Sequence, residues 1–144
     1  MKAILGLLLL LVCDPLSAQD ELTFTLEVSN LRNEDGSVLV SVFRDQRGFK
    51  AGDPVETIRI PKRGKLKNGR LTSEISLPAG TYGLALVDDE DDNGDMDYNW
   101  LGMPKEGFGF SDYYLSGLSR PVFSDFSFEL KAGKKVVETK FRYL

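Results

Sequence analysis

Seven carboxylates lie within the ten residues from Asp88 to Asp97, and no lysine or arginine stands among them. Like charges at this spacing repel one another, so a compact arrangement of the segment is costly unless a cation neutralises it. The order of the side chains matches the first part of a calcium-binding loop, in which oxygen ligands alternate and a glycine makes the sharp turn. The predicted calcium ligands are Asp89, Asp91, Asn93, Asp95 (through its backbone carbonyl) and Asp97, with Gly94 at the turn.

The match to an EF-hand is incomplete. Trp100 stands where the bidentate glutamate of an EF-hand would be, and no flanking helices are predicted. Asp88, Asn99 or Glu106 could complete the coordination shell. The alternative is an acidic, solvated turn in which Asn93-Gly94 simply reverses the chain.

An aromatic and glycine-rich segment follows the acidic residues. Aromatic rings on a loop ordered by calcium could stack against a sugar or a peptide, and the predicted ligand-binding residues are Trp100, Phe108, Phe110 and Tyr113. The same rings would also serve as extra core that closes the open end of the fold, because large aromatic side chains are usually at least partly buried. The sequence therefore leaves a binding platform and a structural cap as alternatives.

The N-terminal residues 1–18 have the pattern of a secretory signal peptide. Lys2 supplies a positive charge, residues 3–12 are almost uniformly apolar, and Leu16-Ser17-Ala18 offers a small-residue cleavage site. The apolar run is too short to span a bilayer stably. Cys13 is assigned to the discarded segment and not to a lipoprotein anchor, because Val12 precedes it where a small residue is expected. We therefore predict an exported protein, periplasmic or extracellular, with one mature domain at residues 19–144.

The chain from residue 19 onward contains no cysteine and no histidine. Disulfides, thiolate nucleophiles, Cys/His zinc sites and histidine general bases are thereby excluded. The formal net charge of −4, without a basic stripe, argues against a nucleic-acid partner. No further run reaches transmembrane length. A protein or a carbohydrate remains as the class of partner.

Alternating apolar and polar residues dominate the rest of the chain, as in half-buried β-strands. Seven strands and no helix are predicted, at residues 22–28, 38–43, 57–60, 70–77, 81–87, 122–130 and 136–143. The short polar turns favour an all-β, two-sheet sandwich with the first two strands as a hairpin. The segment Leu77 to Tyr82 resembles the turn of transthyretin-like sandwiches, which implies a transthyretin/prealbumin-like fold, with an immunoglobulin-like sandwich as the alternative. Residues 88–118 form a long loop, and loops of this length in a compact domain are often functional.

Several motifs of this chain occur together in one bacterial family. They are Leu77-Pro78-Ala79-Gly80-Thr81-Tyr82, the acidic run from Asp89 to Asp97, Gly102-Met103-Pro104-Lys105-Glu106-Gly107-Phe108-Gly109-Phe110-Ser111, and Phe123-Ser124-Asp125-Phe126. In these motifs the chain resembles the domain-of-unknown-function 2141 family. The resemblance covers essentially the whole mature chain and implies a small exported bacterial protein without an assigned activity.

The favoured function is that of an exported, non-enzymatic binding or structural module with a calcium-ordered acidic loop. One alternative is a subunit of a surface assembly that pairs through an open strand edge. Another is a carboxylate-based hydrolase, which needs two opposed carboxylates about 5–10 Å apart. Glu106 and Asp112 are the carboxylates outside the acidic run that would matter for such a reaction.

Overall fold

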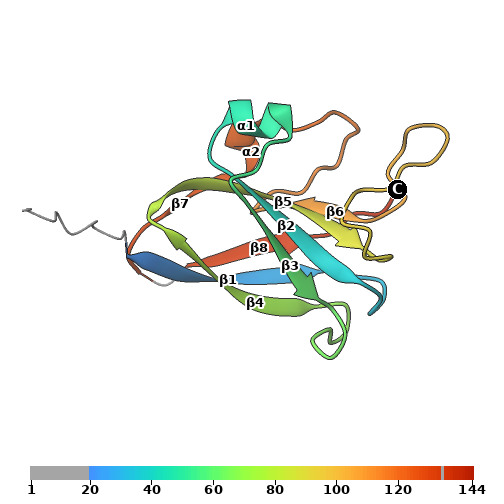
Figure 1. The fold of residues 1–144 in the computed structure, drawn as a ribbon, viewed down its shortest axis with the longest axis horizontal. Coiled ribbons are helices and arrows are strands. Elements are labelled where there is room, and N and C mark those ends of the chain that lie inside the picture. Colours follow the sequence, from blue (N-terminus) through green and yellow to red (C-terminus); the bar gives the residue numbers. More distant parts are fainter. Residues whose placement is uncertain (1–19, 134) are drawn as a thin grey trace, which may run out of the picture.

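The computed structural model describes residues 20–133 and 135–144, and the predicted signal peptide, with Cys13, lies outside them. In the described part, eight strands form two sheets that pack face to face (Figure 1). The predicted all-β sandwich is therefore confirmed, with eight strands in place of about seven. The strands are β1 (Glu21–Ser29), β2 (Ser37–Phe43), β3 (Glu56–Pro61), β4 (Leu71–Pro78), β5 (Gly80–Asp89), β6 (Phe108–Phe110), β7 (Ser127–Leu130) and β8 (Val136–Lys140).

The smaller sheet has the strand order β4-β1-β8, and the larger sheet has the order β3-β2-β5-β6, with β7 paired to the first residues of β5. The predicted hairpin between the first two strands is wrong. Strand β1 pairs with β4 and, in parallel, with β8, whereas β2 pairs with β3 and β5. The two strands supply opposite walls of the core, so their apolar side chains meet across the sandwich and not along one ladder.

The main core lies between the two sheets. Alternate side chains of β1, β2 and β5 are completely buried there, among them Leu26, Val40 and Leu84. Because successive side chains of a strand point to opposite faces, β5 turns Leu84, Leu86 and Asp88 toward this core. The side chains between them, including Val87, and the following Asp89 lie on the outer face of the larger sheet.

Two short helices were not predicted: α1 (Gln46–Ala51) and α2 (Phe123–Phe126). Helix α1 begins where the Asp45 carboxylate accepts a hydrogen bond from the Gly48 amide, and it ends at Gly52, which has a left-handed φ of 66°. Helix α2 occupies the start of the strand predicted at residues 122–130. A second apolar cluster explains both helices, since it covers one end of the outer face with rings of Phe43, Phe49, Phe110 and Phe126.

The predicted loop at residues 88–118 is shorter in the structure than expected. Strand β5 continues to Asp89, and β6 adds Phe108–Phe110 to the edge of the larger sheet opposite Ala85–Val87. The remaining loop projects from the end of the sandwich (Figure 1). Within the described residues, neither helix is long and apolar enough to cross a membrane.

Candidate metal centre

The last two residues of β5 carry adjacent carboxylates that point in opposite directions. Asp88 faces the interior, where it forms an ion pair with Lys62, and neither side chain is exposed to solvent. The Tyr143 hydroxyl donates to the second Asp88 oxygen (2.6 Å). Asp88 is therefore committed to a buried polar cluster, and it does not complete the coordination shell of the acidic loop.

Asp89 shapes the turn that follows. Its two carboxylate oxygens accept hydrogen bonds from the backbone amides of Asn93 (3.1 Å) and Gly94 (2.9 Å). Asp92 and Gly94 adopt left-handed φ values of 56° and 82°, a region that glycine enters without strain and aspartate tolerates. The loop thus wraps around the fully buried carboxylate of Asp89.

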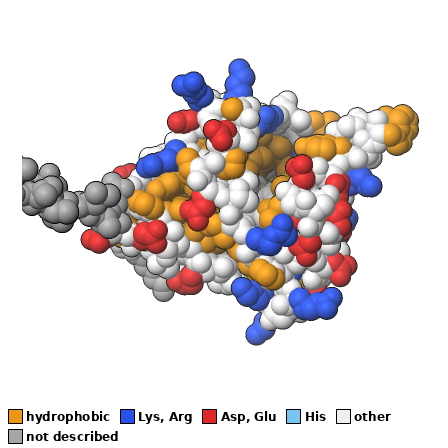
Figure 2. Space-filling model, viewed as in Figure 1, with side chains coloured by type: hydrophobic (Ala, Val, Ile, Leu, Met, Phe, Trp, Pro, Cys, Tyr) orange, Lys and Arg blue, Asp and Glu red, His pale blue; other side chains and the backbone are white. Residues whose placement is uncertain are grey.

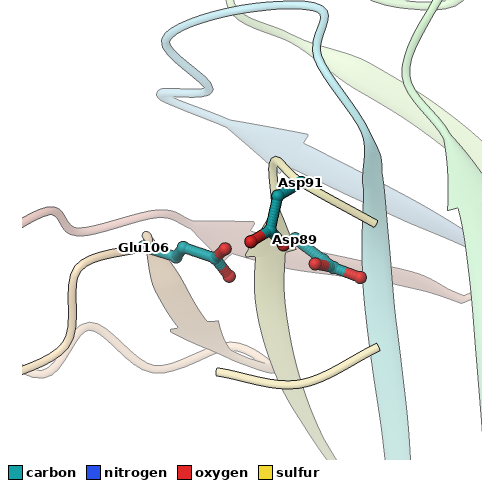
Figure 3. Close-up of side chains that lie close together, drawn as sticks. All are labelled: Asp89, Asp91 and Glu106. Atoms are coloured by element: carbon teal, nitrogen blue, oxygen red, sulfur yellow. The ribbon is translucent and has the colours of Figure 1, made fainter. Parts of the chain in front are cut away.

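Three carboxylates converge beside this turn. Asp89, Asp91 and Glu106 each place an oxygen so that all three oxygens lie within 4.8 Å of one another. In Figure 3 the Glu106 side chain points toward Asp91, whose carboxylate lies between the other two. Glu106 arrives on the chain that returns into β6, held by backbone bonds from Lys105 to Asp97 (2.7 Å) and from Asp88 to Gly107 (2.8 Å).

Basic residues from distant strands neutralise part of the acidic run. Arg32 donates from two nitrogens to both oxygens of Glu90. Arg59 on β3 lies 2.7 Å from an Asp92 oxygen and 3.5 Å from an Asp89 oxygen. With the buried Lys62, three cations therefore surround seven carboxylates, although the sequence showed none within the run. Within the run, Asp91, Asp95 and Asp97 form no ion pair with a described residue.

Glu106 is the most perturbed acid of the cluster. Its side chain is buried (the residue is 5% exposed), and its Oε2 has no hydrogen-bond partner among the described residues. Burial, a hydrogen bond with Asp97, and the charges of Asp97, Asp91 and Asp89 raise the pKa of Glu106 to about 8. A carboxyl group in this state either holds a proton at neutral pH or loses it to solvent when a cation binds in its place.

The structure brings together two of the five predicted ligands, Asp89 and Asp91, and adds Glu106, which the sequence offered only as one of three completing groups. Asn93 uses its amide to donate to Asp97 (2.7 Å) and to accept from the Asp95 amide (2.9 Å). These bonds hold the loop closed. Asp97 lies next to Asp89, Asp91 and Glu106 but is not one of the three converging carboxylates. An Asp95 oxygen accepts a hydrogen bond from the backbone amide of Met96.

Asn99, the other completing group considered, accepts hydrogen bonds from the amides of Leu101 and Met103 and so shapes the tip of the projecting loop. Glu106 could have been singled out from the sequence only if β6 had been recognised, because its place beside Asp91 follows from the pairing of β6 with β5.

The predicted aromatic platform is divided in the structure. Trp100 is 92% exposed at the tip of the projecting loop. Phe110 is buried in the second apolar cluster, and Phe108 and Tyr113 pack against that cluster. Three of the four rings therefore act as core on the outer face of the larger sheet, whereas Trp100 stands apart from them.

The three converging groups offer carboxylate oxygens, which suit a hard cation such as Ca²⁺. The three clustered carboxylates could hold such an ion, and Glu106 would gain the partner that its buried oxygen lacks.

Comparisons with known proteins give one match. Neither the curated proteins nor the solved structures contain a significant relative of this chain. A family model described as "Uncharacterized protein conserved in bacteria (DUF2141)" matches residues 26–138, which is well over half of the chain. The chain therefore belongs to this bacterial family, as its motifs had indicated.

Proposed function

We propose that this protein is an exported, non-catalytic binding or structural module whose acidic loop is ordered by calcium. The observation that carries the proposal is the convergence of Asp89, Asp91 and Glu106, together with the buried, unpartnered oxygen of Glu106. A buried carboxylate beside other carboxylates is costly unless it is protonated or bound to a cation. Calcium would satisfy all three groups at once.

Calcium fits this arrangement better than magnesium does. It accepts six to eight oxygens in flexible geometry, whereas magnesium demands a near-ideal octahedron and retains several waters. Three carboxylates, each able to give one or two oxygens, supply a substantial part of a calcium shell. Backbone carbonyls of the wrapping loop and water would supply the rest.

The primary test is a calcium titration by isothermal calorimetry on the chain from residue 19 onward. We expect binding that is lost in the double variant Asp91→Asn, Glu106→Gln, which removes two ligands but leaves the Asp89 turn intact. The matched control is Asp95→Asn, which removes one charge from the same loop while its backbone carbonyl remains. A wild-type protein that gives no heat with calcium, and no rise in melting temperature, would refute the proposal.

Export rests on the N-terminal pattern. Extracellular calcium modules commonly have dissociation constants of about 0.1–1 mM, a range that suits an exported protein and not a cytosolic one. The measurement is expression of the full chain in a bacterium, followed by fractionation and N-terminal sequencing. We expect a mature protein that begins at Gln19 in the periplasm or medium, whereas uncleaved chain in the cytoplasm would contradict export.

A surface assembly is a second candidate, because β4 forms an edge of the smaller sheet over eight residues. Its one charged side chain is Glu74, and it carries no lysine, so it lacks most of the features that discourage edge-to-edge pairing. The test is the oligomeric state of the purified protein as a function of concentration, with Ser73→Pro to block the ladder of β4. Pairing predicts oligomers that this variant abolishes.

A hydrolase is favoured less, although a carboxyl group with a raised pKa beside ionised carboxylates resembles the acid/base pair of such enzymes. Glu106 is buried, and a general acid must reach its substrate. If calcium fails to bind, hydrolysis of glycosides by wild type but not by Glu106→Gln becomes the interpretation to test.

A further inference from the structure

A groove crosses the outer face of the larger sheet, between the second apolar cluster and the projecting loop. Its volume is about 650 Å³, within the range of small-molecule sites. Figure 2 shows hydrophobic side chains gathered on this side of the molecule, between α1 and the projecting loop. The metal centre lies at the end of the same face, because Asp89 is the last outward-facing residue of β5.

Small side chains create the hollow. Ser41 on β2 and Ala85 on β5 are direct partners in the ladder, and both line the floor. Larger residues surround them, with Phe43 on β2 and Phe110 opposite Ala85 on β6. The floor is therefore lowest where the two small residues meet and rises on both sides.

Two separate segments form the walls. One wall consists of the second apolar cluster, with Phe49, and of the segment between β6 and α2, with Leu115 and Pro121. The other wall comes from the loop that begins at the metal centre, with Met96 and Met103. Methionine side chains are unbranched and adapt to the shape of an apolar ligand.

One charged side chain lines the groove, and it is positive. The Arg120 guanidinium lies over the Phe49 ring, 4.3 Å from the ring centre, and donates to the Phe49 carbonyl (2.6 Å). No aspartate or glutamate is among the lining residues, and Leu144, the last residue of the sequence, lies at the groove as well. An apolar body with an anionic end would complement the apolar lining and the Arg120 guanidinium.

The backbone beneath the groove argues against a peptide. Along the floor, β5 is hydrogen-bonded to β2 on one side and to β6 on the other, so an extended peptide would find no ladder to join. A hydrocarbon chain needs no hydrogen-bond partner. We propose that the groove binds a chain-like carboxylate amphiphile, with its hydrocarbon on the Ser41–Ala85 floor and its carboxylate at Arg120. This names a ligand for the proposed binding module, and only its calcium dependence rests on the calcium proposal.

The test uses the fluorescent probe dansylaminoundecanoic acid and its displacement by hexadecanoate, hexadecanoate methyl ester and hexadecyltrimethylammonium. We expect saturable probe fluorescence that hexadecanoate displaces, with the neutral ester and the cation weaker. Ser41→Leu, which fills the floor, should weaken probe binding at least about tenfold. The matched control is Thr57→Leu, which introduces the same leucine side chain at the Ser41 partner on β3, outside the lining.

Arg120→Ala should weaken the carboxylate about fivefold, as expected for an exposed ion pair, and leave the ester unchanged. Arg63→Ala, on the distant loop between β3 and β4, is the charge control. Absence of saturable probe binding would refute the proposal that the groove binds this ligand. An equal loss of probe affinity in the Ser41→Leu and Thr57→Leu variants would refute it as well. Equal affinity for hexadecanoate, its methyl ester and hexadecyltrimethylammonium would refute the role of Arg120 in binding the carboxylate.

A calcium arm separates this proposal from the previous one. If calcium orders the loop that carries Met96 and Met103, chelation should weaken probe binding. Probe binding that is unchanged by chelator supports the groove and counts against calcium ordering of its wall. Calcium binding without any probe binding would refute the proposed ligand of the groove and would support the proposed metal site.

Discussion

Calcium binding should release a proton at neutral pH, because a ligand of the proposed site holds one in the metal-free protein. Glu106 has a pKa raised to about 8 by burial and by its acidic neighbours. A metal ligand must be deprotonated, so the proton has to leave when calcium enters. At pH 7 a group with this pKa carries about 0.9 proton, and at pH 9 about 0.1.

The same numbers set the pH dependence of affinity. Competition between proton and calcium at one site predicts that affinity rises about ninefold from pH 6 to pH 7 and about tenfold from pH 7 to pH 9. The assay is calorimetry at pH 7 in several buffers of different ionisation enthalpy. The slope of the observed enthalpy against the buffer enthalpy gives the number of protons released.

Variants identify the source of the proton. Glu106→Gln should abolish the release and flatten the pH dependence, whereas Asp95→Asn should retain both. Calcium binding that releases no proton at pH 7 would refute the reasoning, because it would mean that Glu106 is not a ligand or is already ionised. Release that persists in Glu106→Gln would assign the proton to another group.

Further predictions concern the stability of the metal-free fold. Folded Glu106 binds its proton more tightly than Glu106 in the unfolded chain does, so its contribution to the free energy of unfolding should be fully present below pH 4.5 and be lost as the pH rises toward about 8. Urea unfolding at several pH values, with Glu106→Gln as the control, would measure this loss. Lys62→Met leaves Asp88 buried without its cation and should cost about 3–5 kcal/mol in urea unfolding, much of it recovered by adding Asp88→Asn. Gly36→Ala should destabilise the fold by about 1–3 kcal/mol and weaken calcium binding, since φ is 68° there and a Cβ would lie 2.0 Å from the Asp89 carbonyl oxygen. Trp100→Ser should change unfolding free energy by less than about 0.5 kcal/mol, and a larger loss would mean that the ring is packed.

Much of the strand content was predictable because alternation is a local property. A strand that buries one face must alternate, and residues 22–28 and 81–87 do so clearly. The short strand β6 was missed because Phe108-Gly109-Phe110 is too brief to show a period. Helix α2 was missed because Phe123 and Phe126 serve the outer-face cluster, which alternation within one segment does not reveal.

The pairing of strands was less predictable than their positions. The hairpin expected from β1 and β2 has the right strands but the wrong partners, because alternation tells which residues are buried and not which layer they belong to. The metal centre was likewise predictable only in part. The spacing of Asp89, Asp91 and Gly94 is written in consecutive residues, so the turn was predictable.

The sequence by itself determined the run of strands, the dense acidic segment and the glycine that lets it turn, since each depends on neighbours along the chain. Only the tertiary structure decided which charges meet. Arg32 reaches Glu90 across 58 residues, and Arg59 reaches Asp92 across 33. The pairing of β6 with β5 delivers Glu106, and the same sheet presents Ser41 beside Ala85 to form the groove. Sheet register joins residues that are remote in sequence, and the long-range burial that sets it cannot be read from any single segment.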